Sequence, residues 1–427
     1  MYRRLRPIAA VAAAVLTAAV AACGGGGDTA SGKTEVVFSY LWSGQEAAAL
    51  EKVIADFNAS QDKIVVKGVS SPDFQKQLTS MSSANGSFDI SDNFGSGVGA
   101  WASKGILTPL DDFMKTDGYD TADFVPSAMN QMKYDGKTYS MPIALHTQLL
   151  MYNKKLFAEA GIDKAPVTVE EWAADIDKLT KRGADGTITQ LGYANAEINT
   201  SLTTLGFMFG GSWDDAQGKP SPADPGVVAG TKFYADTIPG KYGVDKVRKF
   251  TSGFGEYQSA QNPFYTGKVA TMIDGEWQSV FIKKFAPNLE WGVAPLPYPA
   301  AKPELAGTTQ VTTSTLFIPK NAKHPKEAWT FMKYLLDKKS MLDFTLALGN
   351  LPARTSMVDD PGYAELPNFS AWLAAMKGSN AKSLASGPTA AQYAADLGTA
   401  FDDIAQLRKS PADALAGVAD KAKKYAP

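Results

Sequence analysis

Apolar stretches with two different periods alternate along the chain from residue 35 onward, and this alternation constrains the fold more than any other feature. The segments Glu35–Trp42 and Ile64–Val69 are rich in β-branched and aromatic residues, which is typical of buried strands. Between them, apolar residues three and four positions apart from Leu50 to Phe57 predict a helix. A further helix over Asp73–Ala84 and a short strand over Phe88–Ser91 are predicted next. Strands that alternate with helices predict an α/β fold with a mostly parallel sheet.

Paired polar residues predict where several helices and turns begin. Ser43 and Glu46 have the spacing of a capping box, in which each side chain bonds to a free amide group at the helix start. Thr168 and Glu171 have the same spacing and predict a second helix start. Asp135-Gly136 predicts the turn of a β-hairpin, because both residues tolerate the left-handed backbone that such a turn requires.

The first residues of the chain are predicted to be an export signal. Three arginines precede an apolar run of 15 residues from Ile8 to Ala22, which ends in small residues as a signal peptide does. The run is shorter than the roughly 20 residues that a membrane-spanning helix needs. Val20-Ala21-Ala22-Cys23 resembles the bacterial lipobox, which implies that residues 1–22 are removed and that Cys23 carries a lipid. The alternative is an ordinary secretory signal with a chance cysteine.

The predicted lipid anchor implies a location for the protein. Two or three acyl chains, at about 0.8 kcal/mol per buried CH₂, hold a protein firmly on a bilayer. We therefore expect an exported lipoprotein at the outer face of the cell membrane. Residues 23–33 are Gly-rich and polar, and they are expected to act as a flexible tether.

Composition excludes several classes of function. Lys and Arg number 42 against 44 Asp and Glu, and the signal would remove basic residues only, so nucleic acid is not an expected partner. Cys23 is the only cysteine, so no disulfide is expected. With two histidines, His146 and His324, and no Cys/His cluster, neither a metal site nor a cofactor is expected. The length predicts two or three domains.

Short segments along the chain share the order and spacing of one known family. They are Phe88–Asn93, Gly99–Asp111, Asp135–Pro142, Met151–Phe157, Ala160–Ile162, Phe264–Trp277, Trp291–Pro297, Phe317–Lys320 and Ala328–Leu335. In this order they resemble the extracellular solute-binding proteins of the sugar-binding class of ABC importers, the group that includes maltose-binding protein.

The resemblance implies a two-lobed periplasmic-binding-protein fold of the α/β class (type II-like). Each lobe is then a mixed sheet flanked by helices, and crossing strands form a hinge between the lobes. The crossings are expected near Leu145, near Val311 and near Gly349–Arg354. By analogy, the N-lobe is residues 34–144 plus 314–348, and the C-lobe is residues 145–313 plus 349–427.

The resemblance also implies a function. We expect a monomer that performs no chemistry, binds a mono- or oligosaccharide between its lobes, closes on it and delivers it to an ABC permease in the membrane. One alternative is a binding protein for another small solute, such as a polyamine or a phosphate ester. Others are a surface glycoside hydrolase, which needs two opposed carboxylates, and a structural or adhesive lipoprotein.

Candidate site residues follow from the chemistry of sugars, whose apolar faces pack on aromatic rings and whose hydroxyl groups pair with polar side chains. Trp277 resembles the family's stacking tryptophan, and Asn93 stands where the family lines its cleft. The remaining candidates for ligand contact are Asp274, Trp42, Gln45, Glu46, His146, Gln148, Glu197, Asn199, Trp213 and Arg354.

Several candidates also have a purely structural alternative. Each candidate tryptophan is alternatively a residue that only packs in the interior, and Asp274 is alternatively a turn-forming residue. The alternative role of His146 is a hydrogen-bonded position in the hinge. Glu46 is alternatively a residue of the capping box, and Arg354 is alternatively part of an ion pair between the lobes.

Overall fold

The structure, a computed structural model, describes residues 32–378 and 380–425. The predictions for the signal peptide (residues 1–22), for lipidation at Cys23 and for most of the tether (residues 23–33) fall outside the described residues. Within the described ranges, no helix combines the length and the apolar character needed to cross a membrane.

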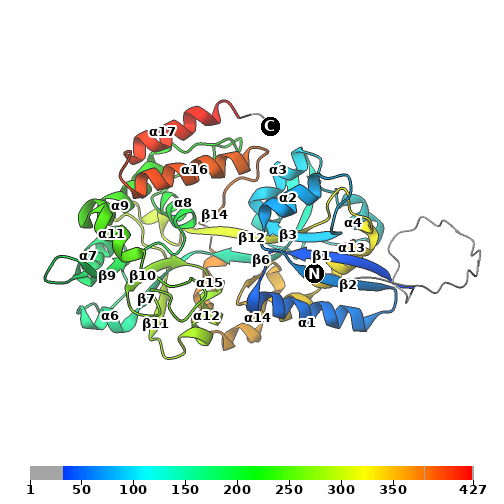
Figure 1. Cartoon of the computed structure of the whole chain (residues 1–427), viewed down its shortest axis with the longest axis horizontal. Coiled ribbons are helices and arrows are strands. Elements are labelled where there is room, and N and C mark those ends of the chain that lie inside the picture. Colours follow the sequence, from blue (N-terminus) through cyan, green and yellow to red (C-terminus); the bar gives the residue numbers. More distant parts are fainter. Residues whose placement is uncertain (1–31, 379, 426–427) are drawn as a thin grey trace, which may run out of the picture.

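Two mixed sheets stand at the two sides of the molecule, and β6 and β12 run across the space between them (Figure 1). The larger sheet contains, in order, β13 (Leu351–Pro352), β6 (Ser140–Thr147), β12 (Thr309–Phe317), β3 (Ile90–Phe94), β1 (Thr34–Tyr40) and β2 (Ile64–Ser70), with β14 (Ala381–Lys382) beside β12. The smaller sheet contains β11 (Trp291–Ala294), β7 (Leu149–Asn153), β10 (Val269–Asp274), β9 (Ile188–Tyr193) and β8 (Lys181–Arg182). This arrangement confirms the α/β class with mixed sheets flanked by helices.

The parallel part of the larger sheet is the part that the alternating periods predict. β1 pairs in parallel with β2 and with β3, as strands joined by α1 and α2 should. The expectation of a mostly parallel sheet is wrong beyond these strands, because β12 is antiparallel to both β3 and β6. β12 comes from far along the chain and enters from the other side of the molecule, which no local pattern reveals.

Helices cover both sheets. Those beside the larger sheet are α1 (Gly44–Ser60), α2 (Phe74–Ser82), α3 (Val98–Ser103), α4 (Asp111–Asp117), α5 (Pro126–Gln131), α13 (Pro325–Leu335) and α14 (Lys338–Leu348). The helix α15 (Phe369–Met376) contacts both sheets, since it packs on β6 and its Trp372 ring lies 6.1 Å from that of Trp291 in β11. Those associated with the smaller sheet are α6 (Lys154–Glu159), α7 (Val169–Leu179), α8 (Ile198–Met208), α9 (Pro225–Thr237), α10 (Pro239–Tyr242), α11 (Val244–Thr251), α12 (Gln278–Phe285), α16 (Ala390–Ala405) and α17 (Pro411–Ala422). Short elements are the hairpin β4 (Lys133–Tyr134) and β5 (Lys137–Thr138), and the 3₁₀ helices η1 (Gly95–Gly97), η2 (Pro303–Leu305), η3 (Thr355–Met357) and η4 (Pro361–Glu365).

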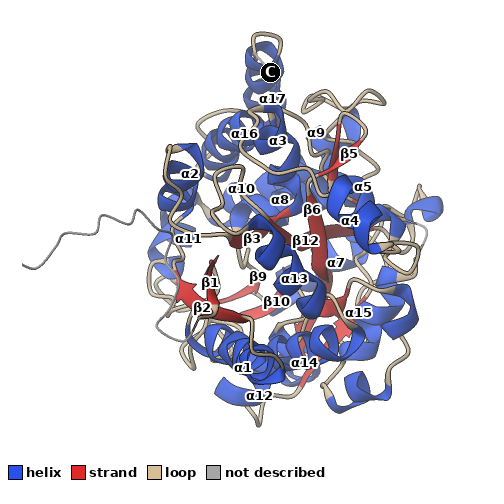
Figure 2. Ribbon diagram, turned by 90° about the vertical axis from the view of Figure 1, so that its right-hand side faces the viewer, coloured by secondary structure: helices blue, strands red, loops and turns tan. Residues whose placement is uncertain are grey.

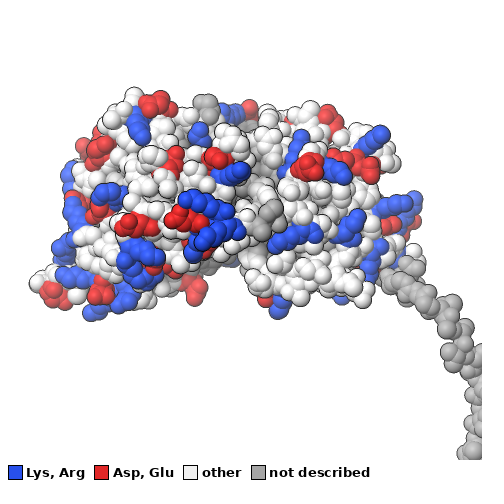
Figure 3. Space-filling view, turned by 90° about the horizontal axis from the view of Figure 1, so that it is seen from above, with Lys and Arg blue, Asp and Glu red and all other residues white. Residues whose placement is uncertain are grey.

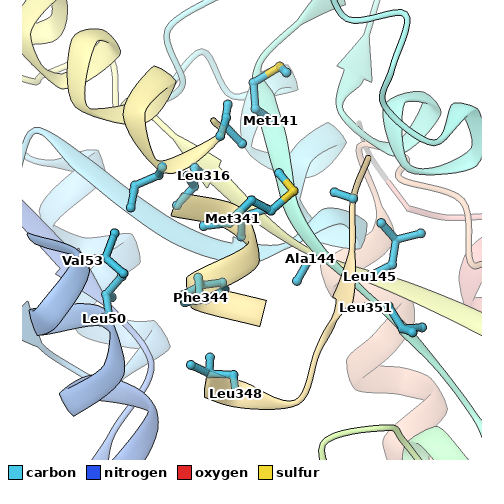
Figure 4. Close-up of a cluster of buried hydrophobic side chains, with 14 of the residues drawn as sticks. Leu50, Val53, Met141, Ala144, Leu145, Leu316, Met341, Phe344, Leu348 and Leu351 are labelled. Carbon is cyan, nitrogen blue, oxygen red and sulfur yellow. The ribbon is translucent and has the colours of Figure 1, made fainter. Parts of the chain in front are cut away.

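A hydrophobic core packs α1 and α14 against the larger sheet. α1 and α14 lie side by side beneath the sheet (Figure 2). Phe344 of α14 lies between Leu50 of α1 and Ala144 of β6, and all three side chains are buried (Figure 4). The Phe344 ring also meets the Trp42 ring edge-on, with 5.1 Å between ring centroids. This contact holds Trp42, which follows β1, in a fixed place.

A second core lies beside the smaller sheet. Trp172 of α7 is fully buried and packs edge-on against Tyr193 of β9, at 4.8 Å between ring centroids. Leu397 and Phe401 of α16 are buried in the same cluster, which ties the C-terminal helices to this sheet rather than to the larger one. The first core is not confined to the larger sheet, because it also contains Met151 of β7, Met272 of β10 and Trp291 of β11.

The chain passes from one sheet to the other at two neighbouring places, between β6 and β7 and at the start of β12. Gln148 alone separates β6 of the larger sheet from β7 of the smaller one. β12 returns antiparallel to β6, with Val311 opposite Thr147 and Phe317 opposite Ser140. β13 pairs with β6 in the larger sheet. Residues 351–352 were predicted to belong to the C-lobe, and in the structure they join the sheet of the N-lobe. Strand membership therefore differs by a few residues from the predicted lobe boundaries.

Local predictions mostly agree with the structure. Thr168 and Glu171 form a complete capping box at the start of α7. Asp135 and Gly136 have φ values of 47° and 74°, the left-handed pair that a tight hairpin turn requires. The capping box predicted for Ser43 and Glu46 is wrong, because the Ser43 side chain makes no capping bond and Glu46 lines a cleft instead.

Charges of both signs are intermixed over the face seen in Figure 3, and no broad basic surface is visible on that face. This distribution agrees with the near balance of 42 basic and 44 acidic residues. A phosphate backbone needs a concentrated positive surface, so this face is not suited to nucleic acid.

Candidate functional site

A cleft of about 830 Å³ lies where the two sheets face each other. α2 contributes to one wall, and α8 and α16 contribute to the other, on the right and left of Figure 1 respectively. β6 and β12 pass between these walls and contribute His146, Gln310 and Ser314 to the lining. A volume of this size suits a small organic ligand, since such pockets usually measure about 300–1,000 Å³.

Most of the predicted site residues meet in this cleft. Those that line it are Trp277, Asp274, Trp42, Asn93, Glu46, His146, Gln148, Glu197 and Asn199. They come from both sides of the molecule, as a ligand site between two lobes requires. Their direct contact with a ligand stays a prediction. The Gln45 side chain lies outside what the structure describes.

Trp213 and Arg354 are placed elsewhere, and neither is among the described residues that line the cleft. Trp213 is fully buried, donates from Nε1 to the Thr203 carbonyl at 2.9 Å and packs edge-on against Phe401. Arg354 pairs with Asp123 at 3.3 Å and lies over the Phe124 ring, beside the larger sheet. We therefore correct the prediction of ligand contact for both to a structural role.

A hydrogen-bonded network fixes the Trp277 indole at the cleft wall. Trp277 Nε1 donates to the Tyr257 hydroxyl at 2.7 Å, and that hydroxyl lies 2.7 and 2.8 Å from the two carboxylate oxygens of Asp274. Gln278 Nε2 donates to both Tyr257 and Asp274, at 2.9 and 2.8 Å. Asp274 therefore holds Tyr257, and through it the Trp277 indole, in place, and its own oxygens are largely occupied. Burial raises the pKa of Asp274 to about 7, although hydrogen bonds from Tyr257, Gly275 and Gln278 oppose this.

A second buried group links the two sheets beside Trp277. Glu276 is fully buried, and its carboxylate bonds to His146 Nδ1 at 2.7 Å and to the Thr147 backbone amide at 3.1 Å. The other ring nitrogen of His146 lies 2.9 Å from Ser314 Oγ on β12. The loop after β10 is thus bonded directly to β6 and, through His146, to β12, where the chain passes between the sheets. His146 is hydrogen-bonded where the chain passes between the sheets, as its structural alternative supposes, and it also lines the cleft.

The opposite wall is built from the carboxyl end of β3. Asp92 is buried and accepts a hydrogen bond from the Leu41 amide at 2.7 Å, while Asn93 Nδ2 donates to Gln77 of α2 at 2.6 Å. Burial raises the pKa of Asp92 to about 7, and the nearby Glu46 charge adds to this shift. Burial also raises the pKa of Glu46, against the influence of His146 and Gln258. The two walls thus contribute carboxyl groups that retain a proton more readily than usual.

Replacing Asp92 by Asn should remove a pH dependence of stability. The pKa of Asp92 rises from 3.8 to about 7 on folding, so its contribution to stability is present below pH 4 and is lost as the pH rises to about 7. Asn keeps an acceptor for Leu41 and cannot ionise. We expect Asp92→Asn to be more stable than the wild type at pH 8, with the difference shrinking toward pH 4. Urea unfolding at pH 4, 6 and 8 measures this.

The matched control for Asp92 is Asp62→Asn, at an exposed position of the same lobe. It should show no comparable trend between pH 4 and pH 8. An equal stability difference at all three pH values for Asp92→Asn would show that Asp92 ionises in the fold as readily as in the unfolded chain.

The wall from the smaller sheet supplies mostly uncharged groups. Glu197 caps α8 by accepting from the amides of Asn199 and Thr200, at 3.0 and 2.6 Å. Thr204 Oγ1 donates to Gln310 Oε1 at 2.7 Å, which orients the Gln310 amide at the cleft. Glu197 therefore has a structural task in addition to its place in the lining.

Several residues of the cleft were not predicted from the sequence, of which Tyr257, Gln310, Asp92, Phe74 and Phe94 are examples. Asp92 precedes the predicted Asn93 at the end of a strand, and that position was a usable signal. Tyr257 lies in an irregular segment between α11 and β10, where no period or cap marks it.

The two sides of the molecule also touch directly. The Gly99 amide of α3 donates to Ser386 Oγ at 2.8 Å, and the segment that holds Ser386 leads into α16. A Cβ atom on Gly99 would lie 2.0 Å from the Ser386 carbonyl oxygen, so only glycine permits this approach. The structure therefore shows the two sides drawn together at this point.

Comparison with known proteins agrees with this architecture. A protein of Brucella abortus (strain 2308) that is named a binding protein is 31% identical over 278 residues, which are 64% of this chain and 65% of the relative. The maltotriose-binding protein of Pyrococcus abyssi is 24% identical over 62% of this chain and 54% of its own length. The chain thus spans less than two thirds of the length of these relatives.

Solved structures share the fold over nearly all of the chain. CpMnBP1 with mannotriose bound superposes with a TM-score of 0.82 at 27% identity, and the match covers 91% of this chain and all of that one. The model of the bacterial extracellular solute-binding protein family matches residues 41–342, which is well over half of the sequence. Strands, cleft and sequence match point to the same group, and the chain belongs to the bacterial extracellular solute-binding protein family.

Proposed function

We propose that this protein is the substrate-binding component of an ABC importer and that it binds an uncharged mono- or oligosaccharide in the cleft. One observation carries the proposal: two partly exposed tryptophans, Trp42 and Trp277, come from the two sides of the molecule and line the same cleft. Each is held by a neighbour, Phe344 or Tyr257. Fixed aromatic rings among amide and hydroxyl groups suit the apolar faces and hydroxyl rim of a sugar. The names of the maltotriose- and mannotriose-binding relatives support the same ligand class.

The alternative ligand classes fit the cleft less well. The described residues that line it include no Lys or Arg, which a phosphate ester would need as partners. A polyamine would need several available carboxylates, whereas those of Asp274, Asp92 and Glu197 already accept hydrogen bonds from within the protein. Glycoside hydrolysis needs two carboxyl groups that are available to the substrate. Asp92 and Asp274 both accept hydrogen bonds from within the protein, so we propose a binding role instead.

A thermal-shift screen tests the proposed ligand class. Neutral saccharides such as mannobiose, mannotriose, maltose and maltotriose are compared with glucose 6-phosphate and spermidine. A ligand that binds the folded state alone raises the melting temperature by mass action. We expect at least one neutral saccharide to raise it and the charged solutes to leave it unchanged. A shift with glucose 6-phosphate or spermidine alone would contradict the proposal.

We propose that the exported protein is anchored at the outer face of the cell membrane through Cys23 and acts there as a monomer beside its permease. Cys23→Ala should release the protein from membranes or block its processing, because no acyl chain is then attached. Membrane fractionation and mass spectrometry of the mature N-terminus measure this. Asp28→Ala, in the same segment, is the control and should stay membrane-bound. A Cys23→Ala protein that still carries acyl chains would contradict the anchor.

We propose, finally, that the lobes move as the family resemblance implies, with residues 34–144 plus 314–348 in the N-lobe and residues 145–313 plus 349–427 in the C-lobe. The passages of the chain at Gln148 and β12 support a hinge there. The contact between Gly99 and Ser386 is then a feature of the closed form. A ligand that touches both walls favours that form.

A further inference from the structure

Two exposed aromatic rings lie against each other at the edge of the cleft. Phe74, the first residue of α2, is 50% exposed, and Phe94, the last residue of β3, is 47% exposed. Their rings are stacked, with 6.4 Å between centroids and 28° between planes. Both residues line the cleft, so the pair continues the binding surface outward from Asn93. We call Phe74 and Phe94 the rim platform.

The rim platform differs from the other exposed apolar side chains of the described chain. Val69, Val167 and Leu407 are also 38–47% exposed, and none of them lines the cleft. Single exposed apolar residues are ordinary, whereas adjoining ones at the edge of a groove indicate a binding surface.

Hydrogen bonds hold the two rings in place. Asp73 caps α2 by accepting from the amides of Gln75 and Lys76, both at 3.0 Å, which fixes the helix start that carries Phe74. The Phe94 amide donates to Asn93 Oδ1 at 2.7 Å. The Asn93 amide nitrogen donates in turn to Gln77 of α2 at 2.6 Å.

Gln77 completes this link, because its own amide donates to Ser91 Oγ and to the Asp92 carbonyl, both at 2.8 Å. Gln77 is only 4% exposed, so the network is buried beneath the rings. α2 and β3 therefore present Phe74 and Phe94 as one preorganised surface, which lowers the entropy that a ligand must overcome to bind.

We propose that the rim platform binds an outer ring of an oligosaccharide whose inner rings occupy the cleft between Trp42 and Trp277. This inference rests on the proposed function and narrows its ligand to a chain longer than one sugar. A stacked pair of phenyl rings offers an apolar surface and no hydrogen-bond partners, which suits the C–H face of a sugar. The 830 Å³ of the cleft is large for a single sugar ring.

The test compares ligands of increasing length on variants of the platform. Dissociation constants for mannobiose, mannotriose, maltose and maltotriose are measured by calorimetry on the wild type, Phe94→Ala and Phe74→Ala. We expect each variant to weaken binding of the preferred trisaccharide about tenfold, which corresponds to about 1.4 kcal/mol. The shorter ligand of the same series should bind nearly as before, so the ratio of the two constants should fall toward one. Phe94→Trp, which keeps an aromatic ring at this position, should retain the preference for the longer ligand.

Leu407→Ala is the matched control, because Leu407 is 44% exposed and does not line the cleft. It should leave every constant unchanged. If the wild type binds these saccharides and both Phe variants keep its length preference, the rim platform is not a subsite and the inference fails alone. If the wild type binds no neutral saccharide, the proposed function fails and the inference with it. Circular dichroism establishes that the variants are folded.

Discussion

Glu276→Ala is expected to lower the free energy of unfolding by about 3 kcal/mol, the scale for losing one partner of a buried, hydrogen-bonded pair. The change leaves the His146 ring and the Thr147 amide without their partner at the passage between the sheets. Both groups are buried, so water cannot replace the carboxylate fully. Denaturant unfolding monitored by circular dichroism measures the loss.

Glu290→Ala is the control for this prediction, since Glu290 is exposed on the same lobe. It should change the stability by no more than about 0.5 kcal/mol, as surface substitutions usually do. A Glu276→Ala protein as stable as the control would show that the bonds of Glu276 to β6 contribute nothing net to the fold.

Trp277→Ala is expected to weaken sugar binding by roughly 1–3 kcal/mol, because the variant loses both the buried area and the ring face of a stacking contact. The fold should persist, since Trp277 is only partly buried and lies at the cleft wall. Calorimetry with the saccharide that the thermal-shift screen identifies measures the change.

Phe285→Ala tests whether any loss is specific to the cleft. Phe285 ends the helix α12 that starts beside Trp277, and it does not line the cleft. Its replacement should leave the affinity unchanged. Unaltered affinity in Trp277→Ala itself would remove this tryptophan from the site and would weaken the proposed function directly.

Local pattern was sufficient for much of this fold because much of it is locally determined. The parallel strands β1 and β2 and the helix between them have periods that identify them without any tertiary information. The capping box at Thr168 formed as predicted, since its partners are three residues apart in one helix turn. The place of β12 between β3 and β6 depends on a chain return from residue 309, which no window of sequence contains.

In the candidate site too, some residues could be predicted from local sequence and others depend on contacts in the folded chain. Trp277 and Asn93 were found through the segments that resemble a family, and both line the cleft. Trp213 has the same residue type and a loop position, yet it is buried against Phe401, whose proximity only the folded chain reveals. Glu46 has the spacing of a capping residue, yet in the structure it lines the cleft. The role of Tyr257 depends on Asp274 and Trp277 meeting it in space, so its own neighbours in sequence gave no signal.

The central claim is that a sugar binds between two lobes and draws them together. Small-angle X-ray scattering of the full mature protein, with and without the saccharide that raises its melting temperature, tests this claim most directly. We predict a smaller radius of gyration with the sugar, and a scattering curve that then fits the present structure, in which Gly99 meets Ser386 at 2.8 Å. A sugar that binds tightly and leaves the radius of gyration unchanged would contradict the account.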